Sequence, residues 1–166
     1  MGDFESALQA RIARNAQLAE QRRQAEQEMD RVEAAAEERR AREAAEREQA
    51  ARVRHGELVD TLTAAATALR TASPRHFIVR MGWSASGEEF IAKISSRQLH
   101  PARTLFIELD RDDDEVLVRW TSDLGKALEL WRLLEVSPPV IEQLVLTIAD
   151  QDLWRESDRV PPFPEV

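Results

Sequence analysis

From residue 3 to residue 55 the chain contains neither glycine nor proline, the two residues that most disfavour a helix. Between residues 20 and 54, 31 of the 35 residues are alanine, glutamate, glutamine or arginine, all strong helix formers. This composition predicts an uninterrupted helix, about 80 Å long at ~1.5 Å per residue. Because a single helix encloses no pocket, we expect function to lie in what this helix binds or in the rest of the chain.

Apolar residues recur along this helix with the seven-residue period of a coiled coil, although incompletely. The best register places these candidate partner-binding residues at its core positions: Leu8, Asn15, Leu18, Ala25, Met29, Val32 and Ala36. Arg11 and Arg22 occupy core positions as well, so the coiled coil is weak. We predict that the stretch Leu18–Ala36 meets another helix, and that a buried Asn15 sets the register.

The following stretch is predicted to be helical without a partner. It carries three glutamate–arginine pairs four residues apart, Glu38–Arg42, Glu43–Arg47 and Glu48–Arg52, with the acid on the N-terminal side. Each such pair stabilises a helix by about 0.2–0.5 kcal/mol. Residues 37–52 are therefore expected to form a solvated spacer. The alternative to association of the helix with a second helix is that the whole helix acts only as a spacer.

Gly56 interrupts the pattern, and a more apolar helical stripe then continues to Ser73-Pro74, where proline ends it. We interpret Gly56 as a glycine tolerated within a helix rather than as a hinge. The predicted organisation has four parts: a long charged helix (1–56) acting as weak coiled coil and spacer, a connecting amphipathic helix (57–73), an α+β domain (74–154) and a proline-rich tail (155–166). We expect the tail to dock on its own domain or to stay unstructured, rather than to act as a recognition peptide.

After Pro74 the hydrophobic period changes from helical to alternating, which is typical of strands. Four strands are expected at residues 76–81, 88–96, 104–109 and 116–120, forming an antiparallel sheet covered on one face. Their inward-facing residues are predicted to be Phe77, Val79, Met81, Phe90, Ala92, Ile94, Leu105, Ile107, Leu109, Val116, Val118 and Trp120. Two helices, one over residues 123–134 and one beginning at Ser137-Pro138, are expected to supply the cover. The predicted fold class is therefore α+β.

Charge and composition limit the kinds of partner that this protein is expected to bind. The net charge is −8, with −2 over residues 1–57 and −6 over residues 58–166, so binding to nucleic acid or to an anionic membrane is not expected. The chain has no cysteine, and no apolar run typical of a signal peptide or membrane span is seen, so we expect a cytoplasmic protein. Arginine outnumbers lysine by 21 to 2, a bias associated with GC-rich bacterial sources.

Motifs for catalysis are missing. The acidic segment 110–115 lacks the glycine and the spacing of a calcium loop, and the segment 82–87 lacks the glycine of a nucleophile elbow. The histidines are scattered, so we predict no catalytic residue, no metal site and no cofactor. Trp83, within a loop rich in glycine and serine, is a candidate partner-binding anchor, although core packing is the favoured interpretation.

These observations predict a non-enzymatic assembly or adaptor protein. Its N-terminal helix is expected to self-associate or to bind a protein partner, and its α+β domain to act as an interaction module. The alternative is a structural subunit of a larger hetero-complex, in which the helix pairs with another protein. An enzyme acting through loops 82–87 and 110–115 is the less favoured third possibility.

Overall fold

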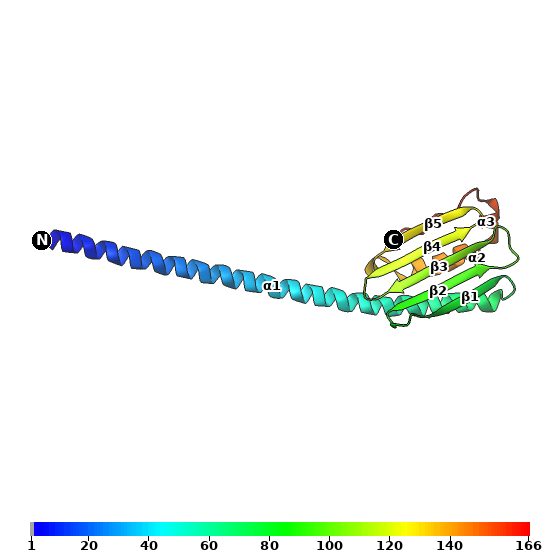
Figure 1. Ribbon diagram of the computed structural model, residues 1–166, viewed down its shortest axis with the longest axis horizontal. Coiled ribbons are helices and arrows are strands. Elements are labelled where there is room, and N and C mark those ends of the chain that lie inside the picture. Colours follow the sequence, from blue (N-terminus) through cyan, green and yellow to red (C-terminus); the bar gives the residue numbers. More distant parts are fainter. Residues whose placement is uncertain (1) are drawn as a thin grey trace. The chain divides into compact units, whose positions relative to one another are not determined.

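The computed structural model describes residues 2–166 and divides into two compact units, Met1–Arg47 and Glu48–Val166. One helix, α1 (Gly2–Ala72), contributes to both units and continues through Gly56 (Figure 1). The elements that follow are β1 (Phe77–Trp83), β2 (Glu89–Ser96), β3 (Arg103–Asp110), β4 (Glu115–Ser122), β5 (Gly125–Trp131), a 3-10 turn (Leu133–Glu135), α2 (Pro138–Ala149) and α3 (Gln151–Glu156). The predicted α+β class is confirmed.

Within the first unit, α1 buries no side chain between residues 2 and 47. Of the three predicted ion pairs, only Glu48–Arg52, at the start of the second unit, forms, with 3.0 Å between Oε1 and Nη2. The pairs Glu38–Arg42 and Glu43–Arg47 are not formed along the described helix, whereas Glu28 and Arg31 pair at 3.3 Å. Such exposed pairs contribute little, because water screens them and both long side chains lose freedom.

The second unit contains a five-stranded antiparallel sheet in which each strand pairs with the next along the chain, in the order β1-β2-β3-β4-β5. The predicted inward-facing residues are confirmed: all are buried except Met81, which is half-buried. Alternation along the strands places these side chains on one face of the sheet.

The prediction of four strands, followed by a helix over residues 123–134, is wrong. Ser122 is paired with Gly125, so Asp123 and Leu124 form a two-residue hairpin loop that leads into β5. Gly125 has a φ of +131°, a value that side-chain-bearing residues rarely adopt and that a helix excludes. The Ser122 hydroxyl donates to the Gly125 carbonyl oxygen at 2.9 Å, which closes the turn.

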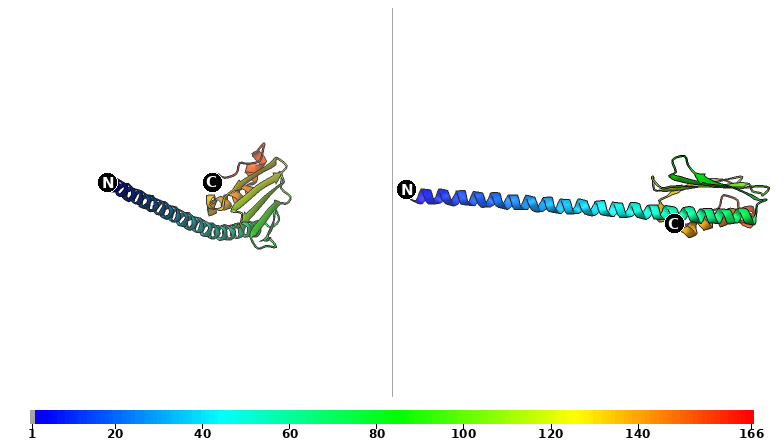
Figure 2. Two further views of the ribbon diagram at one scale, coloured as in Figure 1. Left: turned by 60° about the vertical axis from the view of Figure 1, so that its left-hand side comes forward. Right: turned by 90° about the horizontal axis from the view of Figure 1, so that it is seen from below.

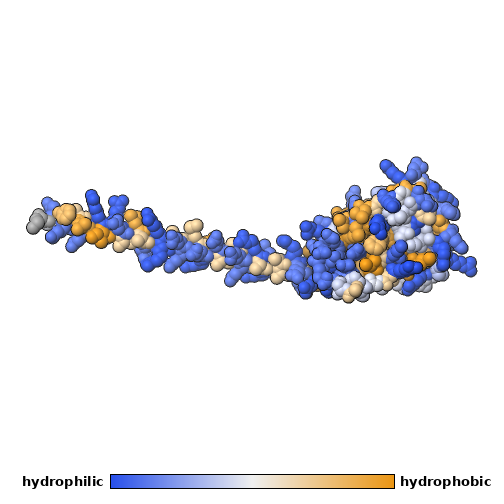
Figure 3. All heavy atoms as spheres, in the orientation of Figure 1, coloured by the Kyte–Doolittle hydropathy of each residue, from blue (hydrophilic) through white to orange (hydrophobic). Residues whose placement is uncertain are grey.

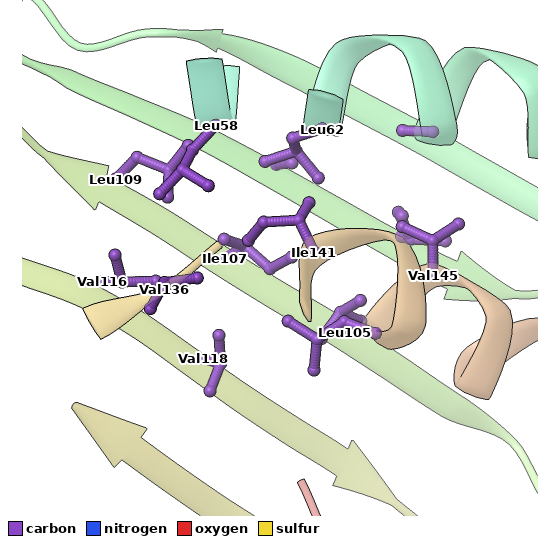
Figure 4. Close-up of a cluster of buried hydrophobic side chains, with 14 of the residues drawn as sticks. Leu58, Leu62, Leu105, Ile107, Leu109, Val116, Val118, Val136, Ile141 and Val145 are labelled. Atoms are coloured by element: carbon purple, nitrogen blue, oxygen red, sulfur yellow. The ribbon is translucent and has the colours of Figure 1, made fainter. Parts of the chain in front are cut away.

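Helices α1 and α2 lie against the same face of the sheet, and the opposite face is left bare (Figure 2). Leu58 and Leu62 from α1 and Ile141 from α2 meet the side chains of β3 and β4 in this layer (Figure 4). All three are completely buried. The cover is therefore built from α1 and α2: the predicted helix that begins at Ser137-Pro138 is confirmed as α2, and α1 takes the place of the helix predicted over residues 123–134.

The C-terminal part turns sharply after α2. The Asp150 carboxylate accepts a hydrogen bond from the Leu153 amide at 3.1 Å and so caps α3. The buried Trp154 donates from Nε1 to the Thr147 carbonyl oxygen at 2.8 Å. Beyond α3 the tail docks on its own domain, because the ring of Phe163 stacks on Trp120 with centroids 5.7 Å apart.

Arg103, at the start of β3, is almost completely buried at 2% exposure. Its Nε and Nη2 donate to the Ile148 carbonyl oxygen, near the end of α2, at 3.1 and 3.0 Å. Its Nη1 donates to the Pro101 carbonyl oxygen at 3.1 Å and to Gln151 Oε1 at 2.7 Å. Burial lowers the pKa of Arg103 from its usual value, and the nearby Asp150 carboxylate opposes that shift. This arginine joins the sheet to the C-terminal helices.

The second unit uses α1 from residue 48 onward, so a fragment that begins later should be less stable. The His55 ring donates from Nε2 to the Leu109 carbonyl oxygen at 2.9 Å, and Arg54 donates from Nη1 to the Val136 carbonyl oxygen at 2.6 Å. We expect residues 57–166 to be about 2–4 kcal/mol less stable than residues 48–166, because both carbonyl oxygens lose a partner. Urea unfolding followed by tryptophan fluorescence measures the difference, and equal midpoints would contradict it.

Candidate interaction surfaces

The predicted partner-binding residues of α1 are exposed in the first unit. The exposed fraction is 46% for Leu8 and 42% for Leu18, and it is 70% for Met29 and 60% for Val32. Asn15 and Ala25 are exposed and Ala36 is half-buried. Met29 and Val32 line a shallow apolar hollow on the helix surface. These seven residues are named the seam below.

Two apolar residues near the start of α1 were missed by the sequence analysis. Phe4 is 72% exposed and Ile12 is 58% exposed. Phe4 lies four residues before Leu8, at a core position of the same coiled-coil register. Ile12 lies four residues after Leu8, about one helical turn further along the same side of the helix. Phe4 could have been identified from the sequence, because it occupies the next core position when the coiled-coil register is extended toward the N-terminus.

Trp83 is the last residue of β1 and not a loop residue as the sequence suggested. Its ring centroid lies 5.7 Å from that of His55 and 5.2 Å from that of Phe90. The side chain nevertheless remains 52% exposed. Trp83 thus packs against His55 and Phe90 while about half of its surface stays exposed to solvent.

The bare face of the sheet carries a row of residues that the sequence analysis did not connect. The strand register places Arg80 opposite Lys93, Lys93 opposite Phe106, Phe106 opposite Arg119 and Arg119 opposite Leu128. The Arg119 guanidinium lies over the Phe106 ring, 4.7 Å from its centroid. These five residues, which cross all five strands, are named the cationic row. Lys126 lies on the same face, so both lysines of the chain are found there.

Apolar side chains surround the cations of this row. Ile78 on β1 is 39% exposed, and Leu128 and Leu130 on β5 are 54% and 57% exposed. Ile91 and Leu117 lie on the same face and are half-buried. Figure 3 shows hydrophobic and hydrophilic residues interspersed over the strands. An antiparallel sheet facing water is usually polar on that side, so this mixture of apolar and cationic side chains is typical of a protein-binding surface.

A separate apolar groove of about 700 Å³ lies between the end of α1 and α2. Its walls are formed mainly by small side chains, among them Ala64, Ala68 and Ala149, and Leu146 from α2 also lines it. Leu146 is 62% exposed. Asp60 and Glu142 are the acidic residues of its lining.

Acidic residues gather at one end of the sheet. Carboxylate oxygens of Glu89, Glu108 and Asp110 lie within 4.8 Å of one another, a spacing at which three carboxylates can hold a metal ion. Asp110 Oδ1, however, already accepts from the backbone amides of Asp112 and Asp113, at 3.1 Å each, and so shapes the β3–β4 turn. We assign Asp110 to that turn and base no metal site on the cluster.

Protonation of this cluster should influence stability. Burial raises the pKa of Glu108, and the Glu89 carboxylate raises it further. A raised folded-state pKa favours folding when the carboxyl is protonated, and this contribution disappears as the pH rises through that pKa. We therefore expect Glu108→Gln to raise Tm by about 1–3 °C at pH 7 and to have no effect near pH 4. Thermal scans at both pH values measure it, and a lower Tm at pH 7 would contradict the assignment.

Comparison with protein-family models, with curated proteins and with solved structures finds no match to this chain. In the described part, residues 2–166, no helix is long and apolar enough to cross a membrane.

Proposed function

We propose that this protein is a non-enzymatic assembly or adaptor protein. The seam of α1 binds the same segment of a second copy, and the unit Glu48–Val166 acts as the interaction domain. One observation carries the proposal: α1 buries no side chain between residues 2 and 47, yet it keeps Leu18, Met29 and Val32 exposed along one register. Large apolar side chains on one line of a helix are stabilised when they meet a second helix.

The two copies are proposed to be parallel and in register. In that arrangement Asn15 faces Asn15 of the second copy, and each amide can hydrogen-bond the other instead of being buried without a partner. Val32 then also faces its counterpart, whereas Ala34 points away from the pair.

Cysteine cross-linking tests this arrangement, because the chain contains no cysteine of its own. A disulfide requires Cα atoms within about 7 Å, so Val32→Cys should form a linked dimer rapidly under mild oxidation. The matched variant Ala34→Cys, on the outer side of the helix, should link at least tenfold more slowly. Equal rates for the two variants would refute the parallel seam.

A hetero-complex is the second candidate, and the arginines of the seam register favour it. Arg11 and Arg22 would each face a like charge in a parallel homodimer, whereas a partner helix with glutamate at those positions would pair with them. Affinity purification from the native host tests this possibility. A stoichiometric partner that is lost when the seam is disrupted would replace the homodimer, and recovery of the protein alone would exclude the hetero-complex.

A further inference from the structure

The cationic row contains a local conflict that no residue of the described chain resolves. Arg80 and Lys93 are directly opposite each other on neighbouring strands, and both point to the bare face. Like charges facing each other across strands are destabilising. Neither side chain forms an ion pair or a hydrogen bond within residues 2–166, although the chain carries 31 acidic residues.

The same two cations line a hollow. Arg80, Lys93, Ile78 and Ser95 enclose about 130 Å³ on the surface of the sheet. At ~30 Å³ per water molecule, this volume holds about four waters, which is enough space for a single carboxylate or phosphate group. The lining therefore offers two cations, a hydroxyl group and one apolar wall to an anionic group.

From this geometry we infer that the bare sheet face binds an acidic segment of another protein, with one of its carboxylates seated between Arg80 and Lys93. The inference rests on the proposed adaptor function and supplies the chemistry of its partner. Two further cations, Arg119 and Lys126, lie on the same face, which is acidic only at the end that carries Glu89, Glu108 and Asp110. The exposed Leu128 and Leu130 can contact apolar side chains of the same segment.

A protein segment fits this face better than a nucleic acid does. Phe106 lies under the Arg119 guanidinium, so its ring is not free to stack on a base. Glu89, Glu108 and Asp110 make one end of the sheet acidic and would repel a continuous phosphate backbone. A partner with a few carboxylates among apolar residues can place its charges on the cations alone.

Binding of a labelled peptide with single glutamates among leucine and valine residues, here called the acidic peptide, to the full-length protein at low salt tests the inference by fluorescence anisotropy. The double variant Arg80→Gln/Lys93→Gln should weaken binding at least tenfold, and high salt should weaken binding to the wild type. The matched control Arg70→Gln/Arg159→Gln, which removes two exposed arginines elsewhere, should leave the affinity unchanged. The sheet variant should keep the wild-type Tm or exceed it, because the substitution removes the like-charge pair.

Three results would overturn the inference. The first is equal affinity of the wild type, the sheet variant and the control for the acidic peptide. The second is tighter binding of an oligothymidylate, lost in the sheet variant, which would identify a nucleic-acid surface. The third is a lower oligomeric mass of the sheet variant, which would mean that a second copy occupies the face. Variants of the seam should bind the acidic peptide normally, so failure of self-association and failure of this inference are distinguishable.

Discussion

Replacing Leu18, Met29 and Val32 together with glutamate is expected to convert the full-length protein from an oligomer to a monomer. Burying one large apolar side chain contributes about 1.5–3 kcal/mol, and each pair of helices would lose such side chains from both copies. The new carboxylates would also face one another across the seam. Since ~1.4 kcal/mol corresponds to a tenfold change, the dissociation constant should rise at least ~100-fold.

The control for this variant carries the same added charge on the outer side of α1. Ala16→Glu, Gln27→Glu and Ala34→Glu lie away from the core positions of the register and should leave the association unchanged. Both triple variants should unfold at the wild-type urea midpoint of the second unit, because residues 2–47 contribute no buried side chain. Equal weakening by both variants would mean that added charge, and not the seam, disrupts association.

Replacing Arg103 with alanine is expected to destabilise the second unit strongly. The substitution leaves the Ile148 carbonyl oxygen, which accepts two hydrogen bonds from Arg103, without those donors in a buried site. It also removes the guanidinium lying 5.4 Å from the Trp154 ring centroid. Hydrogen bonds from a charged group contribute about 1.5–3 kcal/mol each, so we expect a loss of about 3 kcal/mol or more.

Two further variants, Arg103→Lys and Arg119→Ala, should be compared with Arg103→Ala. The Arg103 guanidinium donates hydrogen bonds to three separate acceptors, whereas a lysine ammonium is a single point charge without the planar fork of donors. Arg103→Lys should therefore recover only part of the stability that Arg103→Ala loses. Arg119 is exposed and contacts Phe106, and its removal should cost at most about 1 kcal/mol. Denaturant unfolding followed by tryptophan fluorescence measures all three. If Arg103→Ala and Arg119→Ala had equal midpoints, the bridging role of Arg103 would be wrong.

Most of the sheet could be predicted from the sequence, because apolar residues at every second position clearly indicate a strand where one face of the sheet is fully buried. Leu105, Ile107 and Leu109 are completely buried, and they alternate with the half-buried residues Thr104, Phe106 and Glu108. β5 was mistaken for a helix because Leu124, Leu128 and Trp131 also fit helical spacing. As an edge strand with Leu128 and Leu130 exposed, it lacks the alternation that marked the other strands.

The interaction surfaces were predictable to different degrees. The seam follows from local periodicity alone, so its residues could be named, although association through them is still a prediction. The cationic row depends on register: Arg80 meets Lys93 only because the β1–β2 hairpin pairs Trp83 with Phe90. The burial of Arg103 likewise depends on α2 ending beside β3, a tertiary contact between residues 45 positions apart.

The mass of the full-length protein in solution tests the central claim, self-association through the seam, most directly. Size-exclusion chromatography with light scattering at tens of micromolar should give at least twice the chain mass of 18.9 kDa. The mass should fall toward one chain on dilution. A mass of one chain across that whole concentration range would contradict self-association through α1.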